Sequence, residues 1–166
     1  MFAAKAASGN GISFSGSAGA ADQTVSISDT TNVSVTDLNT LNGNTTGNID
    51  ATNVTSLASA SISHIKTLLT AGNNSTNNFA ATSFQSLATV AVSDTTVSIA
   101  DLNGAIAQAN TATGGTTTEF SVASGATITT GDEAAFSTLL TNEGTNNNIA
   151  ITDQNLNVSI GTISVD

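Results

Sequence analysis

The sequence has no cysteine, proline, tryptophan or tyrosine, and it carries few charges. The lack of cysteine excludes disulfides, a thiol nucleophile and cysteine-ligated metal sites. Lysine and arginine together number 2, against 12 aspartates and glutamates, which gives the 166 residues a formal net charge of −10. So few cationic side chains cannot neutralise a phosphate backbone or an anionic membrane surface. We therefore expect no nucleic-acid partner and no membrane binding.

The residues that build most active sites are also scarce. His64 is the single histidine, and we expect it on the surface of a helix. The glycine turn at 113–116 lacks the lysine of a phosphate-binding loop. Glu119, Glu133 and Glu143 show no pairing typical of a glycosidase. We therefore expect no enzyme, no catalytic residue and no cofactor.

The chain is rich in small polar residues, with 29 threonines, 21 serines and 19 asparagines. Hydrophobic residues make up 39% and the mean hydropathy is +0.13, and their regular spacing favours a folded chain over a disordered one. No apolar run approaches the ~18 residues that cross a bilayer, and residues 1–10 lack the pattern of a Sec signal. We expect the chain to be made in the cytosol, and we expect no insertion into a membrane.

Internal repetition is the most informative feature of the sequence. The stretch 25–39 returns at 90–103, and the Thr-Leu-Leu-Thr at 67–70 returns at 138–141. Residues 77–82 likewise resemble 147–152. These offsets predict an N-terminal arm (1–23), a first repeat unit (24–88), a second unit (89–157) and the opening strands of a truncated third unit (158–166).

Two periodicities alternate within each unit. Val25, Ile27, Val33 and Val35 alternate with serine or threonine, which is typical of strands with one buried face. Helical spacing covers 36–41, 61–71, 100–109 and 130–143, and glycine follows the second and fourth of these stretches. The pattern predicts a mainly β fold with short helices, of the α+β class, in which two repeats of about 65–70 residues stack as a solenoid-like array or a β-sandwich.

Four aspartates recur at matching places of the two units. Asp29 and Asp94 stand in Asp-Thr-Thr, and Asp37 and Asp101 stand in Asp-Leu-Asn. Such residues are typical of turns and helix caps, which is the role we expect. Calcium binding by these carboxylates is the alternative, although the chain has no EF-hand loop and no calcium β-roll repeat.

Sheet edges in this chain have little of the usual protection against pairing with other strands. Proline is absent, and the two lysines are Lys5 in the arm and Lys66 in a predicted helix. Because serine and threonine hydrogen-bond without repelling another strand, we expect association with further copies or with other subunits through ends or edges.

The recurring phrases at 25–31, 36–41, 44–51 and 54–57 resemble a β-strand repeat of giant Thr/Ser/Asn-rich surface proteins of marine cyanobacteria, and similar stretches occur in virion proteins of their phages. The resemblance covers most of 24–100 and extends loosely over the rest. It carries no catalytic residues, and it implies a structural role on the surface of a particle or a cell.

The short chain without an export signal favours the phage side of this resemblance. We expect a non-enzymatic virion protein, a capsid decoration or appendage subunit, that is assembled in the host cytoplasm and docks on the virion surface through Met1, Phe2 and Phe14 of the arm. The first alternative is a cyanobacterial cell-surface or filament protein, exported by a non-Sec route and stabilised by calcium. The second alternative is a glycan-binding module, and the absence of tryptophan and tyrosine counts against this alternative.

Overall fold

The computed structural model describes residues 12–15, 24–74, 78–80, 82–129, 131–144, 146 and 148–157. Four helices and ten strands form within this part of the chain. In chain order they are β1 (Ile12–Ser15), β2 (Thr24–Ile27), α1 (Val35–Asn44), β3 (Ile49–Asp50), β4 (Ser56–Ala60), α2 (Ile62–Gly72), β5 (Thr89–Val92), β6 (Thr96–Ser98), α3 (Ile99–Ala112), β7 (Glu119–Val122), β8 (Thr127–Thr129), α4 (Glu133–Gly144), β9 (Ile149–Ala150) and β10 (Asn155–Asn157).

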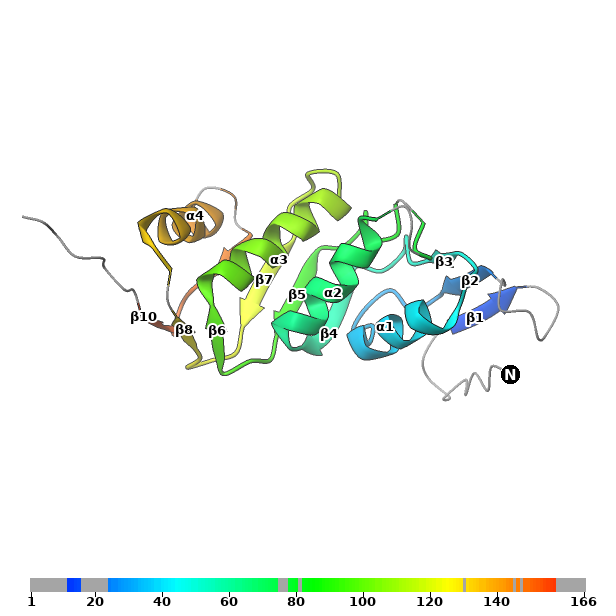
Figure 1. Cartoon of the computed structure of the whole chain (residues 1–166), viewed down its shortest axis with the longest axis horizontal. Helices are drawn as coiled ribbons and strands as arrows, with labels where there is room; N and C mark the ends of the chain where they lie inside the picture. Colours follow the sequence, from blue (N-terminus) through cyan, green and yellow to red (C-terminus); the bar gives the residue numbers. More distant parts are fainter. Residues whose placement is uncertain are drawn as a thin grey trace, which may run out of the picture.

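Strands and helices alternate, and we call each group of strands with the helix that follows it a module. Module 1 covers 24–44, module 2 covers 49–72, module 3 covers 79–112 and module 4 covers 119–144. Module 5 (149–157) consists, in its described residues, of strands alone. Figure 1 shows the modules in this order along the long axis of the molecule, with β1 near one end and α4 and β10 at the other.

Nearly all strand pairing is parallel and joins one module to another. The sheets have the orders β1-β2-β3, β4-β5-β7-β9 and β6-β8-β10, and within them β1 with β2 is the antiparallel pair. Parallel register places apolar residues of different modules side by side. Three rows result: Val25, Ile49 and Phe79; Val33, Leu57, Val90, Phe120 and Ile149; and Val97, Ile128 and Leu156.

A polar side chain caps the start of each helix. The hydroxyls of Ser34, Ser61 and Ser98 accept hydrogen bonds from backbone N–H groups in the first turns of α1, α2 and α3. The Asp132 carboxylate does the same for α4 by accepting from the Ala135 N–H. These bonds satisfy donors that a helix start leaves without an intrahelical partner, and they explain why the four predicted helices form where they do.

The mixed α and β composition is confirmed, but β structure is less dominant than the sequence pattern predicts. The described helices have 10 to 14 residues, while the described strands have 2 to 5. Val35 continues the alternation of Val33, yet it is the first residue of α1 because Ser34 caps that helix. The expectation of a strand at Val35 is therefore wrong.

The repeat seen in the sequence spans two modules. α1 begins at Val35 and α3 begins 64 residues later at Ile99, which matches the offset of the 25–39 stretch. α2 begins at Ile62, and the matching Thr-Leu-Leu-Thr lies in α4. Modules 1 and 3 therefore resemble each other, as do modules 2 and 4.

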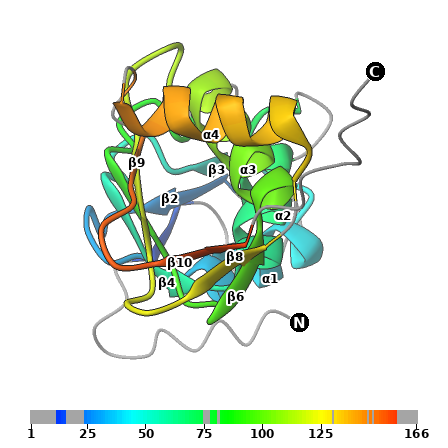
Figure 2. The ribbon, with the colours of Figure 1, turned by 90° about the vertical axis from the view of Figure 1, so that its left-hand side faces the viewer.

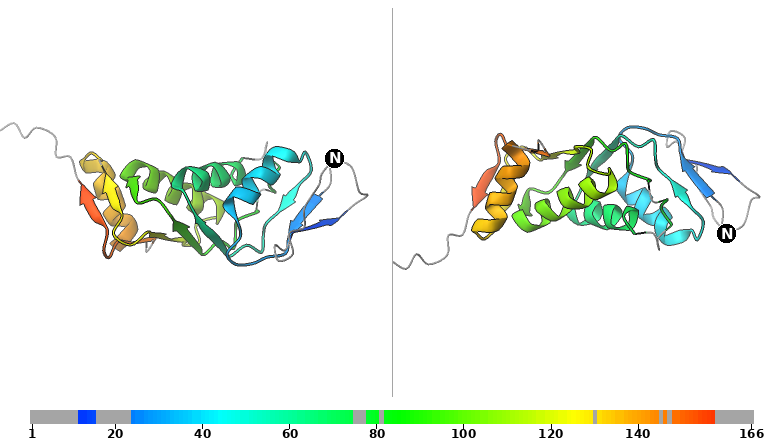
Figure 3. Two further views of the ribbon diagram at one scale, coloured as in Figure 1. Left: turned by 90° about the horizontal axis from the view of Figure 1, so that it is seen from below. Right: turned by 90° about the horizontal axis from the view of Figure 1, so that it is seen from above.

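The helices pack one against the next and cover a core that runs through all the modules. α2 lies between α1 and α3, and α3 lies between α2 and α4. Figure 3 shows the helices of modules 1 to 3 along one side and the strands along the other. The buried apolar residues form one cluster that extends from Val25 to Ile149. Among the described helices, none has the length and apolar character that a bilayer crossing requires.

Gly72 is the last residue of α2, and a close contact that the sequence does not reveal requires a glycine there. A Cβ at this position would lie 2.5 Å from Cδ2 of the Phe84 ring. Phe84 is 1% exposed and packs on Phe79 with ring centroids 5.1 Å apart, so the ring has little room to move. Gly72 thus allows Phe84 of module 3 to pack closely against the end of α2.

Replacing Gly72 with alanine tests this close approach. We expect Gly72→Ala to lower the free energy of unfolding by about 1–3 kcal/mol, because the added methyl group overpacks a rigid core. The control is Gly43→Ala in α1, where a Cβ meets nothing within 4 Å. That variant should stabilise the chain by up to about 1 kcal/mol through helix propensity. Urea unfolding measures both, and an equal effect of the two substitutions would contradict the packing of Phe84 on Gly72.

Candidate functional site

The acidic residues singled out in the sequence lie at the starts of helices or in the connections before them. Asp94 follows β5 in module 3, and its Oδ2 accepts a hydrogen bond of 2.6 Å from the Ile62 N–H at the start of α2. This carboxylate therefore caps a helix of the preceding module and links two modules. Asp37 stands in the first turn of α1, where its N–H donates to the Ser34 hydroxyl.

Asp101 lies in the first turn of α3 and forms an ion pair with Lys66 of α2. The Lys66 Nζ donates to its Oδ1 at 2.6 Å, and the Ser98 hydroxyl donates to its Oδ2 at 2.7 Å. The hydrogen bond from Lys66, followed by that from Ser98, lowers the pKa of the Asp101 carboxyl. Because the side chains of Lys66 and Asp101 are 37% and 45% exposed, water screens this pair and it adds little to stability.

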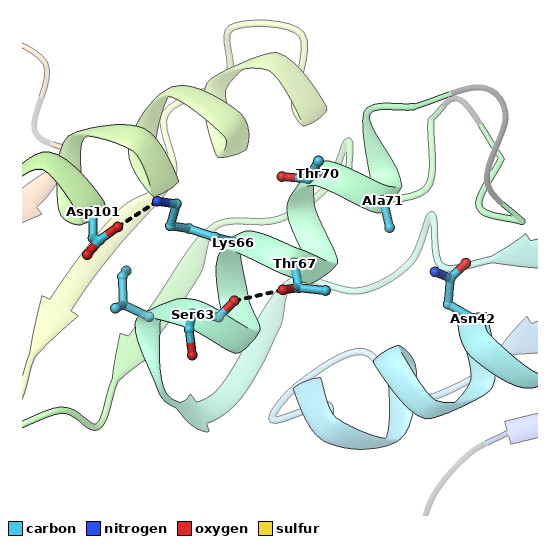
Figure 4. A pocket seen from close by; sticks show the side chains of 8 residues that line it. Asn42, Ser63, Lys66, Thr67, Thr70, Ala71 and Asp101 are labelled. Atoms are coloured by element: carbon cyan, nitrogen blue, oxygen red, sulfur yellow. Dashed lines mark hydrogen bonds and ion pairs between the residues drawn. The ribbon is translucent and has the colours of Figure 1, made fainter.

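An open pocket of about 560 Å³ lies over the outer face of α2. Figure 4 shows Thr67 and Thr70 of α2 between Asn42 of α1 and the Lys66–Asp101 pair. Thr67 uses its hydroxyl to donate to the Ser63 carbonyl of its own helix. Lys66 and Asp101 are the charged residues that line the pocket and they pair with each other, and the other lining residues are neutral.

Asp29 and Asp37 line a second hollow, of about 50 Å³, together with Asn32 and Ser34. Asn32 has a left-handed backbone (φ 55°), and this conformation turns the chain between β2 and α1. Among the described residues, no three histidine, aspartate or glutamate side chains gather as a metal site would require. Calcium binding by these aspartates stays a prediction.

His64 lies on α2 and is exposed, and its ring belongs to neither hollow. Its backbone has structural contacts: the N–H donates to the Ser61 hydroxyl and the carbonyl accepts from Asn39. Of the docking residues proposed from the sequence, Met1 and Phe2 fall outside the described residues. Phe14 belongs to β1, where its backbone is in register with Val25.

Two asparagines that sequence reasoning missed join neighbouring helices in the same way. Asn39 of α1 donates from Nδ2 to the His64 carbonyl of α2 at 3.0 Å. Asn103 of α3 donates from Nδ2 to the Ala135 carbonyl of α4 at 2.8 Å. These residues are the asparagines of the two Asp-Leu-Asn phrases, so the recurrence itself was the signal that could have identified them.

A second set of polar side chains links the modules on the strand side. Asn148, directly before module 5, is 2% exposed, and its Nδ2 donates to the Thr118 carbonyl at 3.2 Å and to the Asn110 Oδ1 at 3.1 Å. The Thr118 hydroxyl in turn donates to the Leu87 carbonyl at 2.9 Å. Asn78, which matches Asn148 in the repeat, donates to the Thr45 carbonyl. These bonds join residues that are 30 to 38 positions apart, which is about one module along the chain.

No protein-family model, curated protein sequence or solved structure matches this chain.

The buried amide of Asn148 provides a test of these links. We expect Asn148→Ala to cost about 2–3 kcal/mol in the free energy of unfolding, because it removes a buried side chain and its hydrogen bond to the buried Thr118 carbonyl. The control is Asn44→Ala, since Asn44 is exposed and donates to the Thr40 carbonyl of its own helix. That change should stay within about 0.5 kcal/mol. Similar losses in both variants, measured by urea unfolding, would show that burial of the link is unimportant.

Proposed function

We propose that the chain is a non-enzymatic structural protein of a phage virion, a capsid decoration or appendage subunit built as a short solenoid. Stacked modules support this proposal, because each module buries its apolar face against the next one. The resemblance of the recurring phrases to surface and virion repeats agrees with such a role. In this proposal the strength and shape of the stack are the function.

The observation that carries the proposal is that polar side chains form hydrogen bonds between successive modules. Asn39 and Asn103 join consecutive helices, while Asn148 and Thr118 join consecutive strand segments. Asn148 and Thr118 are 2% and 0% exposed, and buried polar groups that form hydrogen bonds fix the register of the elements that they join. The abundant asparagine and threonine thus stiffen a rod, which is what a decoration or appendage subunit requires.

The N-terminal arm is proposed to attach the rod to the particle. β1 pairs with β2 near the end of the molecule opposite α4 (Figure 1). The arm that leads into β1 contains Met1 and Phe2, and Phe14 lies in β1 itself. Apolar residues of this kind can anchor in a pocket of a shell subunit.

A cell-surface or filament protein is the second candidate function, and one observation favours it. Leu140 and Leu156 are 46% and 42% exposed, and both belong to the modules at the end opposite β1. Exposed apolar residues at the end of a stack favour further subunits in line with it. This candidate would place the chain in the cell envelope.

Fractionation separates the two candidates. Particles released from an infected culture and the envelopes of uninfected cells are purified on density gradients, and the chain is quantified by mass spectrometry. We expect it in the particle band at a fixed ratio to the major shell protein. Its presence in envelopes alone would support the second candidate and contradict the first.

The attachment site is tested by rebinding to particles stripped of the chain. We expect the double variant Phe2→Ser and Phe14→Ser to bind at least about tenfold more weakly, as loss of an apolar anchor predicts. Thr70→Ser on the exposed face of α2 serves as the control and should bind like the unaltered chain. Unchanged binding of the double variant would show that these side chains are not the anchor.

A further inference from the structure

Two asparagines of the described helices stand directly before a glycine. They are Asn42, before Gly43 in α1, and Asn103, before Gly104 in α3. An asparagine before a glycine can lose its side-chain amide without an enzyme, because the glycine nitrogen can attack the side-chain carbonyl carbon and no Cβ hinders its approach. The two pairs are chemically alike, so any difference in their reactivity comes from the structure around them.

The two pairs lie at different places in their helices. A helix holds the glycine nitrogen in its own hydrogen bond, so the reaction requires the helix to open locally. Asn42 lies two residues before the last residue of α1, in a turn where helices fray. Asn103 lies inside the 14-residue helix α3. Opening at Asn42 therefore breaks fewer helical bonds than opening at Asn103.

The surroundings of the two glycines differ in the same sense. Gly43 is exposed, and a Cβ built on it would meet nothing within 4 Å. A Cβ on Gly104 would lie 3.6 Å from Cε and 3.7 Å from Nζ of Lys66. The ion pair with Asp101 holds the Lys66 side chain in this place. Gly43 is thus open to solvent, whereas Gly104 is covered.

The side-chain amides are also held differently. Asn103 donates from Nδ2 to the Ala135 carbonyl at 2.8 Å, and its Oδ1 accepts from the Asn142 Nδ2 at 3.2 Å. The Oδ1 of Asn42 is buried and has no hydrogen-bond partner among the described residues. The amide of Asn103 is therefore anchored through both of its polar atoms, while the oxygen of the Asn42 amide is not.

The packing of the helices adds to this difference. α3 packs between α2 and α4, whereas α1 packs on α2 and lies at the end of the row of helices. Figure 2 views the stack from the α4 end and shows α3 behind α4, with α1 far back. An opening of α3 thus disturbs two helix contacts, while an opening at the end of α1 disturbs fewer.

We propose that Asn42 is a site of spontaneous deamidation and that the fold protects Asn103 from the same reaction. The Gly43 nitrogen attacks Cγ of Asn42, a new C–N bond closes a succinimide ring, and the Cγ–Nδ2 bond breaks. Nδ2 leaves as ammonia, with a proton that balances the one lost from the Gly43 nitrogen. Water then opens the ring at either carbonyl and gives aspartate or isoaspartate. The net reaction consumes one water and releases one ammonia.

Deamidation at Asn42 would loosen a link between modules. The Asn42 backbone carbonyl accepts a hydrogen bond of 2.8 Å from Nδ2 of Asn78, which also donates to the Thr45 carbonyl. Asn78 stands directly before module 3, so these bonds join the end of α1 to that module. Isoaspartate adds a carbon to the main chain and displaces the Asn42 carbonyl. The modification therefore weakens the stack at module 1.

Incubation of the full chain at mildly alkaline pH, below its unfolding transition, tests the proposal by mass spectrometry of its peptides. We expect Asn42 to deamidate at least about tenfold faster than Asn103, which corresponds to about 1.4 kcal/mol in local opening. In concentrated urea the two rates should become similar, because the fold no longer separates them. Asn44, which is exposed in the same turn but precedes a threonine, is the control and should stay intact.

Two variants separate the chemistry from the opening of the helix. Gly43→Ala should slow the reaction at Asn42 about tenfold or more, since the methyl group hinders the attack and favours the helix. Asn78→Ala should speed it at least about threefold, since loss of a hydrogen bond to the Asn42 carbonyl eases local opening. Neither substitution should change the rate at Asn103. Methylation by an isoaspartate-specific methyltransferase identifies the product.

Equal rates at the two asparagines of the folded chain, or a faster rate at Asn103, would overturn the proposal. An Asn42 that stays intact while the urea-unfolded chain reacts would overturn it as well, and so would a rate that neither variant changes. The inference does not rest on the proposed function, because it concerns the chain alone. The fractionation result therefore leaves it unaffected.

Discussion

Parallel pairing of very short strands from successive modules is the interaction on which the structure depends. β3 and β9 have only two residues each, and the longest described strand has five. Such strands have no stability alone, and each gains it by pairing with a neighbouring strand. The row through Val33, Leu57, Val90, Phe120 and Ile149 passes through all five modules and joins them in one core.

This arrangement also explains the unusual composition. A stack with a narrow core leaves many backbone carbonyls at the junctions between modules, and short polar side chains can reach them. Asn39 and Asn103 do so between helices, and Asn148 and Thr118 do so between strand segments. Charged side chains would be costly at the buried sites of Asn148 and Thr118, because burial disfavours a charge that lacks a close partner. A low charge content and a high asparagine and threonine content thus follow from the same constraint.

The sequence predicted the helices well because their signals are local. The apolar spacing of 61–71 and 100–109 corresponds closely to α2 and α3. The module length was not predicted, since neighbouring modules differ and only alternate ones share phrases. The roles of Gly72 and Asn148 were also missed, because each depends on a residue brought near by the fold: Phe84 above the glycine and Thr118 beside the asparagine.

Native-state hydrogen exchange of the variant Val90→Ala tests most directly whether the modules form a single stack. Val90 is 1% exposed and stands between Leu57 and Phe120 in the longest row. Its truncation should lower the free energy of global opening by about 1–3 kcal/mol. A single stack predicts the same loss for protected amides of α1 and of α4. A loss confined to residues 24–88 or to residues 89–157 would show two independent domains and contradict the account.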